Sequence, residues 1–166
     1  MVFELRKLSI NDGEDIYEML QEIEKEENGF INSVKAMTFE EYKQWLMHND
    51  AASRGEGLQD WMVPQSIFWL YVDDRPVGIG KVRHYLTESL RIEGGHIGYA
   101  IRSTERNKGY GTVLLKMLLN EAKKLGIERA LLTIRLHNYA SLKVAVKNNG
   151  VIEKMDRERY YIWIYC

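Results

Sequence analysis

The sequence is poor in cysteine and proline, and it has no long apolar run. Its 166 residues include two prolines and one cysteine, Cys166. A lone cysteine excludes an intrachain disulfide and a cysteine-based metal cluster, so we expect a reducing, cytoplasmic setting. No apolar stretch approaches the ~20 residues that cross a bilayer, and the opening segment MVFELRKLSI lacks the order of a secretory signal. We therefore expect no membrane partner.

Net charge is also close to zero, although its distribution is uneven. The total is −1 at pH 7, but residues 1–100 hold 18 acidic and 10 basic residues, whereas residues 101–166 hold 6 and 13. This asymmetry predicts a cationic substrate for the first half and an anionic ligand for the second. The alternative is a chance distribution of surface charge.

Two other ligand classes find little support. The basic half lacks a patch of alternating basic and aromatic residues, so we expect no nucleic-acid partner. The histidines do not have the spacing of metal ligands, so we expect no metal. They are His48, His84, His96 and His137.

The hydrophobic pattern predicts an α/β fold with one mixed sheet of about seven strands and about four helices, in a single domain over residues 1–166. A long polar loop at 49–65, of a length that often marks a functional lid, separates the first two helices from the later strands. The expected strands are 3–9, 66–73, 77–86, 95–102, 129–136 and two more after residue 150, and the expected helices are at about 14–23, 38–48, 110–125 and 138–147.

Several helix ends have recognisable signals. The segment TFEE at Thr38 has the capping-box pattern, Asp12 is a candidate cap for the first helix, and Gly126 is a typical helix-terminating glycine. These signals predict where three of the helices begin or end.

The segment RNKGYGT, residues 106–112, precedes the helix expected at 110–125. A helix N-terminus carries unpaired N–H groups and partial positive charge, and glycine lets a phosphate approach the backbone. A pyrophosphate cradle and a simple tight turn both explain the pattern. A dinucleotide fingerprint would need glycine where Leu114 stands, and the Gly-Lys-Ser/Thr of a P-loop is absent.

The remaining pattern, Arg-x-x-Gly-x-Gly at Arg106, Gly109 and Gly111, resembles the signature of the GNAT superfamily of N-acetyltransferases. The segment NYASLKVAVKNNGV (138–151) is similar to that family's later Asn-containing helix, and the element order agrees along the chain. Segments 63–84 and 94–111 resemble a bacterial subgroup described only as predicted acetyltransferases. The resemblance implies a mostly antiparallel sheet of the GNAT type.

The resemblance also implies acetyl-CoA as the acetyl donor. Its pantetheine arm would lie along Tyr99, Ala100 and Ile101. Asn138 would lie near the donor, although a helix N-cap explains it equally well. The pyrophosphate would bind the loop formed by Arg106, Asn107, Lys108, Gly109, Tyr110, Gly111 and Thr112.

The residues that would move protons are less clear. Many family members have a glutamate base on the strand before the motif, and that position falls here near Gly95. Its neighbours Glu93 and His96 are candidate bases; the alternatives are a solvated turn charge and a packed strand histidine. The usual tyrosine proton donor would be Ala145, so Tyr139, Tyr160 and Tyr161 are considered instead, with packing roles as the alternative.

The acceptor would bind in the first half of the chain. Glu22, Glu24, Glu26 and Glu27 either attract a cationic amine or form a solvated face, and Trp61 either caps the pocket or pins its loop. We expect direct attack by a primary amine of a small molecule or peptide on acetyl-CoA in a ternary complex. The alternative is an acyl-CoA-binding regulatory module with little turnover. A homodimer is compatible with either hypothesis.

Overall fold

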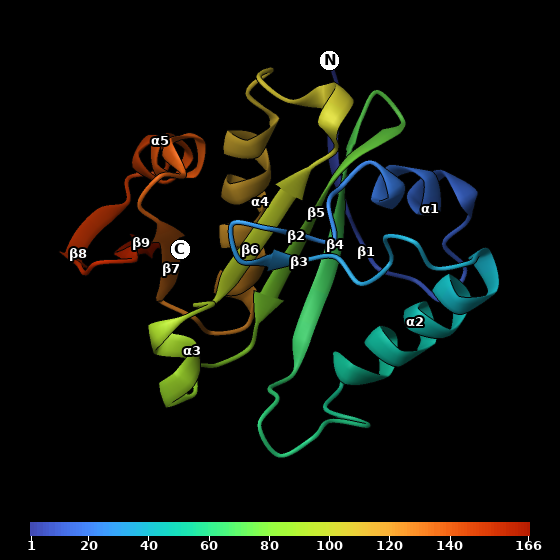
Figure 1. Ribbon diagram of the computed structural model, residues 1–166, viewed down its shortest axis with the longest axis horizontal. Helices are drawn as coiled ribbons and strands as arrows, with labels where there is room; N and C mark the ends of the chain where they lie inside the picture. Colours follow the sequence, from blue (N-terminus) through green and yellow to red (C-terminus); the bar gives the residue numbers. More distant parts are fainter.

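The computed structural model describes residues 1–166 (Figure 1). The helices are α1 (Glu14–Gln21), α2 (Phe39–Ala52), α3 (Glu88–Ile92), α4 (Tyr110–Lys124) and α5 (Tyr139–Lys147), with a short 3-10 helix at Ser103–Glu105. The strands are β1 (Phe3–Lys7), β2 (Glu26–Glu27), β3 (Phe30–Ile31), β4 (Gln65–Val72), β5 (Arg75–Arg83), β6 (Ile97–Ile101), β7 (Arg129–Arg135), β8 (Val151–Met155) and β9 (Arg159–Tyr165).

All seven expected strands are present, but they form two hydrogen-bonded sheets. The first has the order β1-β4-β5-β6 and the second the order β7-β9-β8, and every pairing within them is antiparallel. The helix α4 makes the crossover from β6 to β7. The α/β architecture and its antiparallel pairing are therefore confirmed, but the expected single mixed sheet is divided between β6 and β7.

Helices cover both faces of the first sheet. The helices α1 and α2 pack on one face and α4 on the other (Figure 1). Strand β4 is apolar along nearly its whole length because its alternate residues enter two cores. Phe68 and Leu70 face α4, whereas Ile67 and Trp69 face α1 and α2.

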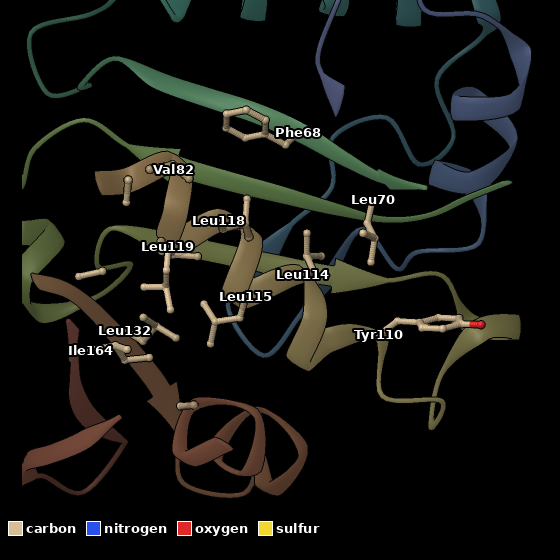
Figure 2. Close-up of a cluster of buried hydrophobic side chains, with 14 of the residues drawn as sticks. Phe68, Leu70, Val82, Tyr110, Leu114, Leu115, Leu118, Leu119, Leu132 and Ile164 are labelled. Carbon is tan, nitrogen blue, oxygen red and sulfur yellow. The ribbon is translucent and has the colours of Figure 1, made fainter. Parts of the chain in front are cut away.

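Helix α4 joins the two sheets into one core. Its apolar side chains reach the first sheet on one side and strands β7 and β9 on the other (Figure 2). Burial of these side chains, each contributing roughly 1.5–3 kcal/mol, stabilises the packing of both sheets on α4. The residues concerned are Leu114, Leu115, Leu118 and Leu119 of α4, with Phe68, Leu70, Val82, Leu132 and Ile164.

The helix-end signals have different outcomes. Thr38 forms the expected capping box with Glu41, and Gly126 follows α4 with a φ of 85°. Asp12 does not cap α1. Gly13 is the N-cap residue, and the Asp12 carboxylate instead accepts hydrogen bonds from Trp69 Nε1 and the Ser9 N–H. Asp12 therefore contacts Trp69, which is distant in sequence, in place of the first N–H groups of α1.

Three features of the fold differ from the sequence expectation. Helix α2 continues to Ala52, so the long loop is shorter and covers residues 53–64. The acidic segment after α1 is the β2–β3 hairpin, which crosses in front of β5 and β6 (Figure 1). Helix α3 was not expected; Thr87 caps it by accepting the Leu90 N–H. The strands β2 and β3 and the helix α3 are too short to produce a clear hydrophobic period.

Candidate functional site

A cleft of about 610 Å³ opens between the two sheets. Its walls come from β5, β6, the start of α4, β7, the start of α5 and the β2–β3 hairpin. The hairpin packs against β6 and forms one side of the cleft. The cleft is therefore bounded by elements from both halves of the chain.

The glycine-containing loop forms one end of this cleft. None of the backbone N–H groups of residues 107–112 has a hydrogen-bond partner within the protein, and no side chain caps α4. Gly109 has a φ of 83°, and no atom lies within 4 Å of the position a Cβ would take. Such a run of unpaired donors at a helix N-terminus suits a phosphate or other anion.

The side chains of the loop have varied surroundings. Asn107, Tyr110, Gly111 and Thr112 line the cleft, as does Asn138. Tyr110 is itself buried and packs in the core. The Oδ1 atom of Asn138 accepts the Ser141 N–H, which is the N-cap geometry for α5.

The two basic side chains of the loop are already paired. Arg106 also lines the cleft, but it donates to the carbonyl oxygen of Ile101 at 3.0 Å and forms an ion pair with Glu27 at 3.0 Å. Lys108 is exposed, lies outside the cleft lining and pairs with Glu105 at 2.8 Å. The anion-binding capacity of the loop therefore comes chiefly from its backbone.

Strand β6 presents an open edge to the cleft. It pairs with β5 on one side only, and Tyr99, Ala100 and Ile101 all line the cleft. The hydroxyl of Tyr99 donates to Ser141 Oγ at 3.1 Å, and burial raises the pKa of Tyr99 to about 12. A phenol with that pKa stays protonated at neutral pH, so it can donate a proton but does not act as a base.

The two sheets meet at Gly95 and His96. The His96 N–H donates to the Leu131 carbonyl oxygen at 2.8 Å, and the Leu131 N–H donates to His96 Nδ1 at 2.9 Å. Burial lowers the pKa of His96 to about 4, with smaller contributions from Arg91 and Arg83. His96 is 8% exposed and does not line the cleft. This geometry favours a structural role for His96.

Gly95 explains the absence of a glutamate at the expected base position. Its φ is 62°, and a Cβ there would collide with the carbonyl oxygen of Leu131 on β7. The turn between α3 and β6 lies directly against β7, so no side chain fits. The role of a base therefore has to be filled from another position or by water.

Glu93 is the candidate base that lines the cleft. Its carboxylate lies 3.8 Å from Arg135 and 3.7 Å from Arg159. The tyrosines considered as proton donors, Tyr139, Tyr160 and Tyr161, all lie outside the lining. Tyr161 instead donates to Asp156. Of the candidate acid–base residues considered from the sequence, Glu93 alone lines the cleft.

The acidic segment is largely neutralised by arginines. Glu22 forms an ion pair with buried Arg102, Glu26 with Arg135 at 3.4 Å and Glu27 with Arg106. These pairs tie the end of α1 and the β2–β3 hairpin to β6 and β7. Their main effect is to fix the hairpin over the cleft.

Sequence reasoning missed the cationic side of the cleft. Lys81, Arg83, Arg135 and Arg159 all line it. Lys81 and Arg83 alternate with Val82 on β5, and this alternation is the signal that could have identified a shared polar face. Trp61, by contrast, is 71% exposed and lies outside the cleft lining.

The chain has neither a metal-binding group nor a helix that could span a membrane. No group of three or more His, Cys, Asp or Glu side chains is placed to hold a metal ion. None of the five helices is both long enough and apolar enough to cross a membrane.

A profile of the acetyltransferase (GNAT) domain family matches residues 3–151 of the chain. The chain belongs to this acetyltransferase family. No match was found among curated protein sequences.

Solved structures with this GNAT fold come from several bacteria. RimL, a ribosomal L7/L12 alpha-N-protein acetyltransferase, has a TM-score of 0.71 and 16% identity, covering 100% of this chain and 91% of its own. A GNAT-family acetyltransferase from Streptococcus pneumoniae gives 0.67 and 16%, covering 99% of both chains. Campylobacter jejuni N-acetyltransferase PseH, in complex with acetyl coenzyme A, gives 0.63 and 16%, also covering 99% of both. At these identities the likeness concerns the fold.

Proposed function

We propose that this chain transfers the acetyl group of acetyl-CoA to a primary amine of a small molecule or peptide, by direct attack in a ternary complex. The observation that carries the proposal is the run of unpaired backbone N–H groups at residues 107–112, beside the open edge of β6 in the same cleft. The two features suit the pyrophosphate and the amide-containing arm of CoA, respectively.

The residues present fit acetyl-CoA as the donor. The N–H groups around Gly109 and Gly111 would hold the pyrophosphate, and the backbone of Tyr99, Ala100 and Ile101 would hold the pantetheine arm. The structure of PseH in complex with acetyl coenzyme A supports this assignment by fold. Acetyl-CoA supplies an activated thioester, and the chain supplies orientation and a site that excludes part of the solvent.

Proton transfer is assigned to residues on the cleft wall. An alkylamine with a pKa near 10.4 must lose a proton before it attacks. Glu93, which lines the cleft, would accept that proton directly or through water. Tyr99, which remains protonated, is placed on the donor strand to return a proton to the departing thiolate.

The experiment separates donor binding from turnover. Calorimetry should show acetyl-CoA binding to the native protein and none to Gly109→Glu, because the new carboxylate would occupy and repel the phosphate position. Gly57→Glu is the matched control: Gly57 also has positive φ and open surroundings, but it lies outside the cleft. Equal affinity in the Gly109 variant and the native protein would contradict the proposed phosphate site.

Turnover is then measured as release of CoA thiol with a panel of amines, amino acids and peptides. Glu93→Gln should lower kcat by about 10²–10⁴-fold if Glu93 is the base, with little change in acetyl-CoA affinity. Tight acetyl-CoA binding without turnover on any acceptor would instead support the regulatory module. The lack of a side chain at Gly95, where many family members have the glutamate base, is the feature that keeps this second function under consideration.

A further inference from the structure

Four cationic side chains converge on the end of the cleft that lies away from the glycine-containing loop. We call Lys81, Arg83, Arg135 and Arg159 the cationic corner; they come from three strands, β5, β7 and β9. The carboxylate that lines the cleft at this end is Glu93, and Arg135 and Arg159 share it. The corner therefore carries excess positive charge.

The excess lies on Lys81 and Arg83. Neither side chain has a carboxylate oxygen within 4.0 Å of its nitrogen atoms, whereas Arg135 and Arg159 both do. Lys81 Nζ donates to the Ile31 carbonyl oxygen at 2.7 Å and lies over the Phe30 ring. Both cations are half-buried, and an unpaired cation in such a position is costly unless an anion joins it.

Arg83 is held by neutral partners as well. Its Nη1 atom donates to the carbonyl oxygens of Gly94 and Gly95, at 3.2 and 3.1 Å. Its remaining N–H groups have no hydrogen-bond partner within the protein, and none of them is buried without one. Desolvation lowers the pKa of both side chains, that of Lys81 to about 8. The free donors of Arg83 are thus directed to a solvated part of the cleft.

The cationic corner lies beside β6, the strand along which the pantetheine arm of acetyl-CoA is proposed to lie. Lys81 is directly opposite Gly98 in the β5–β6 pairing, and the Arg83 N–H donates to the His96 carbonyl oxygen. Strand β6 runs from this end toward the loop that would hold the pyrophosphate. The acyl end of an arm laid along β6 would therefore point toward Lys81 and Arg83.

Resting on the proposed acetyltransferase function, we propose that the acceptor is a primary amine that also bears a carboxylate, and that Lys81 and Arg83 bind this carboxylate. A guanidinium and an ammonium together provide charge-assisted hydrogen bonds to both carboxylate oxygens. The carboxylate then anchors the acceptor while its amine faces the thioester. This assignment differs from the expectation of a cationic acceptor, because Glu22, Glu26 and Glu27 are already paired with arginines.

The test compares amines that differ only in the carboxylate. The pairs are tyrosine and tyramine, histidine and histamine, and lysine and cadaverine. A peptide pair, Ser-Asp-Ala-Ala-amide and Ser-Asn-Ala-Ala-amide, distinguishes a side-chain carboxylate from that of a free amino acid. The carboxylated member of at least one pair should have a kcat/KM roughly 10–100-fold higher, as expected for hydrogen bonds to a charged group.

Substitutions in the cationic corner then test whether its side chains cause the preference for the carboxylated acceptor. Lys81→Met and Arg83→Met should each raise KM for the carboxylated acceptor about tenfold or more and remove the preference, while KM for acetyl-CoA is unchanged. Lys81→Arg should retain it, and Lys116→Met, on the exposed side of α4, is the control. If Arg83 only pins the Gly94–Gly95 turn, its variant will lose stability and activity equally for both members of each pair.

The outcomes separate the two proposals. Turnover of tyramine, histamine or cadaverine equal to that of its carboxylated partner leaves acetyl transfer standing and overturns the carboxylate site. Absence of turnover with every amine overturns acetyl transfer, and the carboxylate site is then decided by binding alone. Calorimetry with N-acetyltyrosine and N-acetyltyramine in the presence of CoA gives a reading that needs no turnover. Tighter binding of N-acetyltyrosine, lost in Arg83→Met, supports the site, and equal binding overturns it.

Discussion

At the scale of single residues, His96 shows how one hydrogen bond constrains a protonation state. Its Nδ1 atom accepts the Leu131 N–H, so only the neutral imidazole with its proton on Nε2 fits this site. Protonation would put a second donor against the Leu131 N–H. The pKa of about 4 follows from this burial and from nearby arginines.

We therefore expect the stability of the protein to depend on His96 between pH 6.5 and 4. Its folded-state pKa lies below the ordinary value, so the unfolded chain takes up the proton first. The stabilisation is complete above pH 6.5 and falls by roughly 3 kcal/mol as the pH drops to about 4. Urea unfolding across this range measures it. The slope should become smaller in His96→Ala and remain unchanged in His48→Ala, where an exposed ring is removed; an unchanged slope in His96→Ala would contradict the assignment.

At the scale of elements, the turn before β6 packs against β7 with no space for a side chain. Gly95→Ala would place a Cβ against the Leu131 carbonyl at a positive φ. We expect a loss of about 2–3 kcal/mol from overpacking and backbone strain. Gly98→Ala is the matched control, because its Cβ would make ordinary contact with Phe30 at 3.5 Å. Chemical denaturation measures both, and equal losses would contradict the proposed close packing.

The end of α1 is joined to the end of β6 by a second element-scale contact. Glu22 accepts hydrogen bonds from Arg102 and Thr104, and the Arg102 bond chiefly lowers the pKa of Glu22 to about 2. This stabilisation is complete above the ordinary glutamate pKa of about 4.3 and is lost as the pH falls through 2. Glu22→Gln should cost about 3 kcal/mol at pH 7, because it leaves the buried Arg102 without its counter-ion.

Glu24→Gln is the control for this pair, since Glu24 is exposed and has no ion-pair partner. Unfolding at pH 7 and at pH 3 should show the Glu22 effect shrinking at the lower pH. A cost that is the same for both glutamates would contradict the importance of the Arg102 contact.

At the scale of the whole molecule, acetyl-CoA should stabilise the fold, because it would occupy a cleft between two sheets. At a concentration of 100 times Kd the gain is about 2.7 kcal/mol, or roughly 5–10 °C in Tm for a chain of this size. Differential scanning fluorimetry measures the shift. Gly109→Glu should show none, and a flat response in the native protein would contradict donor binding.

The sequence predicts those parts of the molecule that depend on local chemistry. The seven longer strands, the Thr38 capping box and the glycine-containing loop each have a signal within a few residues, and all are where they were expected. The division between β6 and β7 has no local signal, because it results from how α4 holds the sheets apart. Lys81 and Arg83 do have a local signal, their alternation on β5, but their proposed role depends on the absence of a carboxylate across the cleft, which no local pattern shows.

The unpaired N–H groups of residues 107–112 have a consequence for how this site can change over time. Recognition through main-chain atoms depends on backbone shape, so most side chains of the loop are free to vary. Lys108 illustrates this: its N–H is one of the unpaired donors, while its ammonium group lies outside the cleft lining and pairs with Glu105. Substitutions that keep the left-handed backbone at Gly109 should be neutral there. The proposed donor site could therefore persist through extensive sequence divergence, whereas the proposed acceptor site, built from individual side chains, could acquire a new preference through one or two substitutions.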